Sequence, residues 1–173
     1  MVTGDEDPTQ VLIRSTPDFQ VGKVSSYLTG DPNLLIAGET LRYTITVKNV
    51  GNDDAVDAIL RDQSPVNTQY AVGSTSLNGV PVADAPGGTS PLSVGLLVLA
   101  PENPTPGALR ADPSPAADNV ATLIFDVVVD PGVLDGTVIS NQAFVSAPGS
   151  GISDRPSDDP LTPILDDPTR DVV

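Results

Sequence analysis

Cysteine and histidine are both absent from this sequence of 173 residues. Zinc sites of the usual kind, thiol nucleophiles and Ser-His or Cys-His catalytic pairs are therefore excluded, because each needs one of these side chains. Most enzyme classes lose their usual catalytic groups. A chain without thiols suits either redox compartment, so the absence of cysteine is compatible with export without proving it.

Basic residues are scarce as well, with 8 lysines and arginines against 23 acidic residues and a formal net charge of -15. Nucleic acids and anionic membranes are unsuitable partners for such a chain, because phosphate neutralisation needs clustered Lys and Arg. The same charge favours solubility and the binding of divalent cations.

Long apolar runs are also missing. No stretch approaches the length of a membrane span, so we expect no direct membrane insertion. The first ten residues, MVTGDEDPTQ, lack the basic region and the apolar region of a secretory signal. Either export is specified elsewhere or the sequence is an excised fragment, and its acidic, linker-like start favours the fragment.

The residues that are present indicate an all-β fold. The chain has 18 prolines and 15 glycines, and its apolar residues come mostly as short runs between turn-forming residues. No helical period persists over several turns, so we expect low helix content. About seven to nine antiparallel strands would form an immunoglobulin-like β-sandwich. Alternation and turn boundaries predict strands at 19–26, 41–49, 55–62, 71–77, 92–99, 121–129 and 138–146.

The length of the chain suits one domain with tails. We expect a linker or leading strand over residues 1–16, the sandwich over 17–147, and an acidic, proline-rich linker over 148–173. Asp7-Pro8-Thr9 recurs as Asp167-Pro168-Thr169, which favours a single unit cut from a tandem array over chance recurrence.

Two connections between the predicted strands stand out. Asn78-Gly79 is a strong signal for a two-residue hairpin. Residues 101–119 are rich in Pro, Ala, Asp and Asn and predict a long surface loop.

Three predicted strands each carry one polar residue on an otherwise apolar face. Successive side chains of a strand point to opposite faces, so residues two apart share a face. The residues that share these faces are Phe19 and Val21 with Lys23; Val56, Ala58 and Leu60 with Asp62; and Ile139, Ala143 and Val145 with Asn141.

A lysine, an aspartate and an asparagine in one apolar core form a reactive set. Burial makes the amine lose its proton more readily and keeps the carboxyl protonated. The neutral Lys23 amine can then attack the Asn141 carboxamide while Asp62 polarises the carbonyl and shuttles protons. Ammonia leaves, and an amide crosslink joins the first strand to the last.

Four segments of the sequence carry a resemblance to a known family. They are Gly22-Lys23-Val24, AGETLRYTITVKNVGN (37–52), AVDAILRDQSP (55–65) and GTVISNQAFV (136–145). Together they resemble the bacterial surface-protein repeat known as domain of unknown function eleven, and they are similar to the isopeptide-forming domains of Gram-positive pilins. The match covers residues 18–147.

The resemblance implies an immunoglobulin-like sandwich within a large exported protein. In the pilin relatives, a Lys on the first strand bonds to an Asn on the last with help from an Asp, and these roles fall on Lys23, Asn141 and Asp62. The loop 101–119 is longer than the family pattern.

Each member of this set also has an ordinary interpretation. Asn141 could satisfy backbone groups at a bulge, Asp62 could form the turn before Pro65, and Lys23 could extend to solvent at a sheet edge. The other lysine, Lys48, has the parity of a solvent-facing residue. Glu39 is the reserve carboxyl if Asp62 is not the catalytic one.

Acidic residues crowd the C-terminal part of the chain. Carboxylates on flexible loops suit Ca²⁺, which could stiffen a linker between domains. The spacing matches no defined calcium loop, so a solvated acidic tail is the competing interpretation. The candidate ligands are Asp154, Asp158, Asp159, Asp166 and Asp167.

We interpret the sequence as a structural repeat, a spacer or stalk, of an exported bacterial surface or adhesin-type protein located outside the cell. Its partners would be neighbouring repeats of the same polypeptide or other surface-protein subunits, and its only catalysis would be one self-crosslinking event. The alternatives are a filament subunit that adds its tail, residues 161–173, as a strand to a neighbour, and a calcium-dependent ligand-binding module.

Overall fold

The computed structural model describes residues 15–103, 105–112, 114 and 119–173. Two parts of the predicted organisation lie outside the described residues. They are residues 1–14 of the leading segment, which include Asp7-Pro8-Thr9, and part of the loop 101–119. In the described part of the chain, no helix has the length and apolar character needed to cross a membrane.

The described chain is an all-β sandwich of antiparallel sheets, with only short 3₁₀ turns at Pro91–Ser93 and Pro148–Ser150. The first sheet has the order β1-β2-β8-β5-β6, with β4 also paired to β8, and the second has the order β11-β10-β3-β7. A third pair joins β12 to β9. The strands are β1 (Phe19–Tyr27), β2 (Thr40–Asn49), β3 (Ile59–Asp62), β4 (Thr68–Tyr70), β5 (Ser76–Leu77), β6 (Val80–Pro81), β7 (Leu96–Leu97), β8 (Ala121–Val129), β9 (Val138–Asn141), β10 (Ala143–Ala147), β11 (Ile152–Pro156) and β12 (Thr169–Val172).

The three longest strands, β1, β2 and β8, are neighbours and form most of the first sheet. Their apolar residues alternate with polar ones, so one face of each strand is buried against the second sheet. Tyr43 of β2 and Phe125 of β8 lie directly opposite each other, with ring centroids 5.3 Å apart at the centre of the core. The alternation of apolar residues therefore identified these strands correctly.

The predicted strand 55–62 is shorter in the structure. Ala55 forms an isolated bridge to Leu109, Val56 is exposed, and the regular strand β3 begins only at Ile59. The predicted strand 138–146 is divided at Gln142 into β9 and β10, which belong to different sheets. Divisions of this kind raise the number of strands above the expected seven to nine.

Residues 148–173 are not the linker that the sequence suggested. They supply β11, which pairs with β10, and β12, which pairs with β9. The inward-facing residues of β12 are Thr169 and Asp171, both almost fully buried. Because these residues are polar, the strand has no apolar alternation that could reveal it. The predicted donation of the tail to a neighbour is also contradicted, since β12 is paired within its own chain.

Asn78 and Gly79 form the predicted two-residue hairpin. They connect β5 to β6, and Leu77 pairs directly with Val80. Both turn residues have positive φ, 51° for Asn78 and 78° for Gly79, as a type I′ turn requires. The Asn78 amide donates to the Leu99 carbonyl at 2.7 Å, which anchors the hairpin to the body of the domain.

A Gly79→Ala variant is expected to lose about 1 kcal/mol of stability, because only glycine adopts a positive φ without steric cost. A Cβ at this position meets no atom within 4 Å, so the loss measures backbone strain alone. Gly132 is equally open but is not among the glycines with positive φ, so Gly132→Ala serves as the matched control. Urea unfolding of both variants makes the comparison, and equal midpoints would contradict the prediction.

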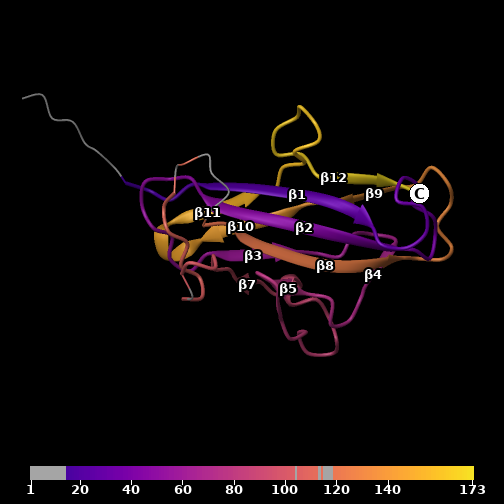
Figure 1. The fold of residues 1–173 in the computed structure, drawn as a ribbon, viewed down its shortest axis with the longest axis horizontal. Helices are drawn as coiled ribbons and strands as arrows, with labels where there is room; N and C mark the ends of the chain where they lie inside the picture. The colour runs from indigo at the N-terminus through magenta and orange to yellow at the C-terminus, as the bar shows by residue number, and fades with distance from the viewer. Residues whose placement is uncertain (1–14, 104, 113, 115–118) are drawn as a thin grey trace, which may run out of the picture.

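The sandwich is elongated along its strands (Figure 1). β1 begins at one end of the molecule, and the C-terminus lies at the opposite end. The two ends of the described chain therefore lie at opposite ends of the domain.

Candidate functional site

Lys23 and Asp62 form an ion pair inside the core. Lys23 Nζ lies 2.5 Å from Asp62 Oδ2, and both side chains are fully inaccessible to solvent. Lys23 is on β1 of one sheet and Asp62 is at the end of β3 of the other, so the pair crosses the interior of the sandwich. Nζ also lies 4.6 Å from the ring centroid of Tyr43 and 5.6 Å from that of Phe125.

Burial shifts the ionisation of both groups toward their neutral forms. Desolvation lowers the pKa of Lys23 to about 8, although the attraction and hydrogen bond of Asp62 act in the opposite direction. Desolvation likewise raises the pKa of Asp62, despite the nearby amine. Burial thus acts on the pKa values of both groups in the direction that favours a neutral amine and a protonated carboxyl.

Asn141 is the third member of this buried cluster. It lies at the end of β9, and Ala143, at the start of β10, pairs directly with Asp62. On its other side, Asn141 pairs with Thr169 of β12, whose hydroxyl donates to the Lys23 carbonyl at 2.9 Å. The Asn141 side chain thus reaches Asp62, and the strand that pairs with Asn141 is bonded to Lys23.

The carboxamide of Asn141 faces the Asp62 carboxyl and the Tyr43 hydroxyl. It acts to lower the pKa of both Asp62 and the Tyr43 hydroxyl, although burial raises both pKa values overall. Within the described residues, Asn141 Nδ2, Asp62 Oδ1 and the Tyr43 hydroxyl make no well-aligned hydrogen bond. Unpaired polar atoms are costly in a dry core, so a cluster of them needs an explanation.

The cluster has the parts needed for an amide exchange. It holds a potential nucleophile in the Lys23 amine, a carboxamide in Asn141 and a proton carrier in Asp62. The structure brings the three sequence-predicted residues together, each less than 5% exposed. Their chemical role stays a prediction.

Lys48 and Glu39 differ from this cluster. Lys48 was expected to face solvent but is only 7% exposed, because residues of the loop 101–119 cover it. Its Nζ donates to the Ser114 carbonyl at 2.6 Å and lies 3.1 Å from Asp112 Oδ2. Glu39, the reserve carboxyl, accepts a hydrogen bond from the Ile36 backbone instead of approaching Lys23.

The five predicted calcium ligands are not gathered into one site. Within the described part of the chain, no three acidic side chains are placed to hold a metal ion together. The physical reason is that the side-chain oxygens of four of the five are held by other partners. Asp154 pairs with Arg61, Asp158 accepts from the Asp166 backbone, Asp159 accepts from the Leu161 backbone, and Asp167 accepts from the Thr162 hydroxyl.

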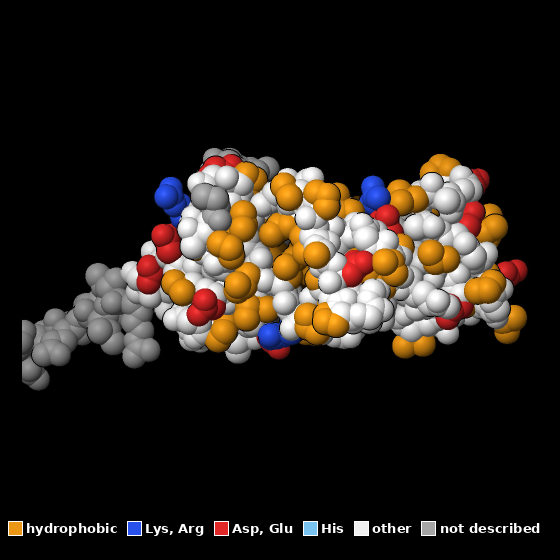
Figure 2. Space-filling model, turned by 90° about the horizontal axis from the view of Figure 1, so that it is seen from below, with side chains coloured by type: hydrophobic (Ala, Val, Ile, Leu, Met, Phe, Trp, Pro, Cys, Tyr) orange, Lys and Arg blue, Asp and Glu red, His pale blue; other side chains and the backbone are white. Residues whose placement is uncertain are grey.

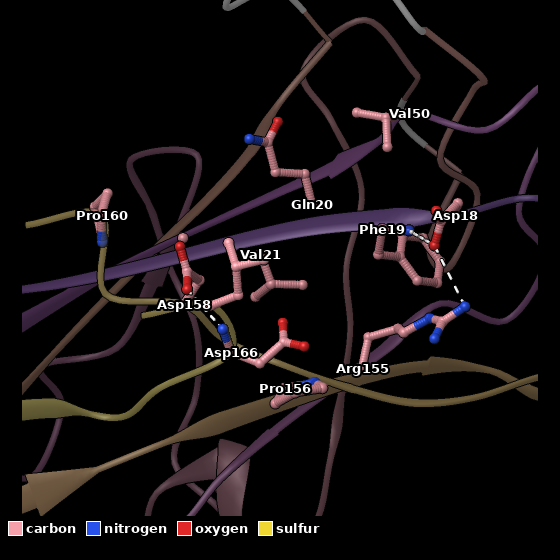
Figure 3. A pocket seen from close by; sticks show the side chains of 12 residues that line it. Asp18, Phe19, Gln20, Val21, Val50, Arg155, Pro156, Asp158, Pro160 and Asp166 are labelled. Atoms are coloured by element: carbon pink, nitrogen blue, oxygen red, sulfur yellow. Dashed lines mark hydrogen bonds and ion pairs between the residues drawn. The ribbon is translucent and has the colours of Figure 1, made fainter. Parts of the chain in front are cut away.

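Asp158 and Asp166 lie at a surface groove of about 570 Å³ between the start of β1 and β11 (Figure 3). The Asp158 backbone bonds to both Val21 and Lys23, so the tail is fastened along the outer edge of β1. An ion pair between Arg155 and Asp18 spans the groove at 3.5 Å. These acidic residues attach the tail to the domain.

The sequence analysis did not predict the residues of β12 that lie beside the Lys23–Asp62–Asn141 cluster and bond to β1. Asp171 is 4% exposed and accepts a hydrogen bond from the Ser25 hydroxyl at 2.6 Å. Burial raises its pKa, and the negative charge of Asp159 adds to this effect. No local signal marks Asp171, because its partners on β1 lie far away in the sequence.

The fold defines a class: an immunoglobulin-like antiparallel β-sandwich. A solved structure with this architecture is that of BcpA, the major pilin subunit of Bacillus cereus, which aligns with a TM-score of 0.50 at 15% sequence identity. The alignment covers 90% of this chain and 40% of the pilin, so the chain spans less than half the length of that protein.

Two further comparisons gave no match. No protein-family model matches the chain. No curated protein matches it either. The resemblance to the domain of unknown function eleven therefore stays a prediction.

Proposed function

We propose that this domain is a structural module, a spacer or stalk segment, of an exported bacterial surface protein, and that it stabilises itself with a Lys23–Asn141 isopeptide bond. The observation that carries the proposal is the fully buried Lys23–Asp62 pair with the Asn141 carboxamide beside it. A buried ion pair is weak evidence for stability alone, since apolar residues of similar size often serve equally well. A reactive role accounts for its presence.

The reaction is a transfer of one acyl group. The neutral Lys23 amine attacks Cγ of Asn141, with protonated Asp62 hydrogen-bonded to the carbonyl oxygen. The new C–N bond forms, the bond from Cγ to Nδ2 breaks, and the amine proton passes through Asp62 to the departing nitrogen. Ammonia leaves and Asp62 ends in its starting state, so the domain turns over once and acts on no external substrate.

Two features of the fold support a spacer role. β1 begins at one end of the elongated domain and the C-terminus lies at the other, an arrangement that suits a segment under tension (Figure 1). The sandwich is also similar to a major pilin subunit. On this proposal the domain lies outside the cell, and its partners are neighbouring repeats of the same polypeptide or other subunits of a surface assembly.

Intact mass spectrometry tests the proposal directly. The parent chain is expected to weigh one ammonia less than its sequence, whereas Lys23→Ala and Asn141→Ala variants should have their full sequence masses. A Lys48→Ala variant is the matched control and should keep the deficit, because Lys48 lies in the separate cluster with Asp112. Full sequence mass in the parent chain would refute the crosslink.

A further inference from the structure

The C-terminal tail binds the backbone of Lys23. β1 is the edge strand of the first sheet and pairs within that sheet with β2 alone. On its other side, the Lys23 N–H donates to the Asp158 carbonyl at 2.9 Å, and the Lys23 carbonyl accepts from the Thr169 hydroxyl at 2.9 Å. The backbone groups along a sheet edge need partners, and at Lys23 the tail supplies them. Both backbone polar groups of Lys23 are therefore held by the tail.

The same strand of the tail holds Asn141. Thr169 lies directly opposite Asn141 in the antiparallel pair of β12 and β9, and Figure 1 shows these two strands side by side. Thr169 is only 3% exposed, so its contacts lie inside the domain. Thr169 therefore bonds to the backbone of Lys23 and is the strand partner of Asn141.

The geometry of the reaction depends on how these two backbones are spaced. The Lys23 amine ends a flexible four-carbon stem, whereas the Asn141 carboxamide is attached close to its backbone. Attack requires the amine nitrogen and the carboxamide carbon to lie about 3 to 3.5 Å apart and aligned, and a misplacement of about 1 Å can lower the rate about 100-fold. The spacing of β1 and β9 therefore decides whether the two groups meet in a reactive geometry, and Thr169 connects those strands.

We propose that Thr169 positions Lys23 against Asn141, and that the crosslink forms only when the tail has docked. The inference deepens the proposed function and rests on it. The Thr169 hydroxyl binds a backbone carbonyl rather than a reacting atom, so Thr169 is a positioning residue, and the bonds that form and break are those of the Lys23–Asn141 reaction. Because β12 is the last strand of the described chain, the crosslink closes the domain only after its other strands have been synthesised.

The tail and the β5–β6 hairpin lie on opposite sides of the sandwich. In Figure 1 the loop that leads into β12 stands above the sheets, while β5 lies below them. Figure 2 shows that lower side, with hydrophobic side chains exposed over its middle. Val80 of β6 is 66% exposed, so a Val80→Ala variant changes the chain away from the tail and serves as a distant control.

The rate of crosslinking tests the proposal. The full chain is isolated in urea at its full sequence mass, refolded by dilution, and followed by intact mass spectrometry as ammonia is lost. Thr169→Val keeps the shape of the side chain but removes the hydroxyl, and the rate is expected to fall about tenfold or more. Thr169→Ser restores the hydroxyl, so it should react within about threefold of the parent rate, as should Val80→Ala.

A Ser25→Ala variant separates positioning from stability. It removes another bond between β1 and β12, the 2.6 Å bond from the Ser25 hydroxyl to Asp171, and should keep the rate within about threefold of the parent. Urea unfolding of Ser25→Ala and Thr169→Val in the Asn141→Ala chain, which cannot crosslink, compares their stabilities, and rates are measured where both chains are folded.

Three results would overturn the positioning role while the crosslink itself stands. They are a parent-like rate in Thr169→Val, equal slowing by Ser25→Ala, and no recovery in Thr169→Ser. A parent chain that never loses ammonia would instead refute the crosslink, and the positioning role with it.

Discussion

Under force, an Asn141→Ala chain pulled by its two ends is expected to extend about 400 Å further than the parent chain. In the parent chain, an isopeptide bond between Lys23 and Asn141 would exclude every residue between them from extension. The variant lacks the bond, so the same residues unravel at up to ~3.5 Å each. Single-molecule force spectroscopy measures this difference as the length released on unfolding.

A Ser140→Ala chain is the matched control for the pulling experiment. Ser140 is the exposed neighbour of Asn141 on the same strand, so its loss should leave the released length unchanged. Equal lengths for the parent and Asn141→Ala chains would show that residues 23–141 are not covalently closed. By the chain-entropy argument, closing a loop of this size also adds about 5 kcal/mol of stability, which chemical denaturation measures independently.

An Asp62→Ala chain is expected to show two defects together. It should keep its full sequence mass, because no carboxyl remains to carry the proton. It should also be less stable than Asn141→Ala by about 3 kcal/mol, because the Lys23 amine stays buried without its partner. Mass spectrometry and urea unfolding at neutral pH provide the two measurements.

The stability of the Asp62→Ala chain should rise with pH. Burial lowers the pKa of Lys23 from 10.5 to about 8 with Asp62 present, and loss of Asp62 removes the opposing attraction. Between pH 8 and 10.5 the unfolded chain therefore binds a proton that the folded chain lacks, and stability increases across this window.

Asp154→Ala provides the matched control for the loss of Asp62. The Asp154–Arg61 pair has the same 2.5 Å separation as the Lys23–Asp62 pair, but its side chains are 52% and 40% exposed. Its removal should cost less than about 1 kcal/mol. Similar losses for Asp154→Ala and Asp62→Ala would contradict the assignment of Lys23–Asp62 as a buried, coupled pair.

The long strands and the central polar residues could be predicted from the sequence for one physical reason. In a strand that is buried on one face, every second side chain is buried. The alternation of apolar residues in β1, β2 and β8 therefore predicts these strands. A polar residue in register with such a run must then point inward, as Lys23, Asp62 and Asn141 do. The hairpin at Asn78-Gly79 could also be predicted, because few residue pairs tolerate two successive positive φ angles.

Other features followed no local rule. Lys48 has the parity of an exposed residue, and it is buried only because a distant loop folds over it. The acidic tail suggested calcium, yet its carboxylates bind backbone groups and an arginine that come close only after folding. Spacing alone does not distinguish a metal ligand from a turn-forming aspartate.

The sequence by itself determined the β-sandwich class, the strands with apolar alternation and the identity of three inward-facing polar residues. The tertiary structure alone decided that the tail completes the domain. β12 buries Thr169 and Asp171, whose partners Lys23 and Ser25 lie 146 residues earlier in the chain. A polar residue becomes a favourable core residue only when such a distant partner satisfies it, and no local pattern records that partner.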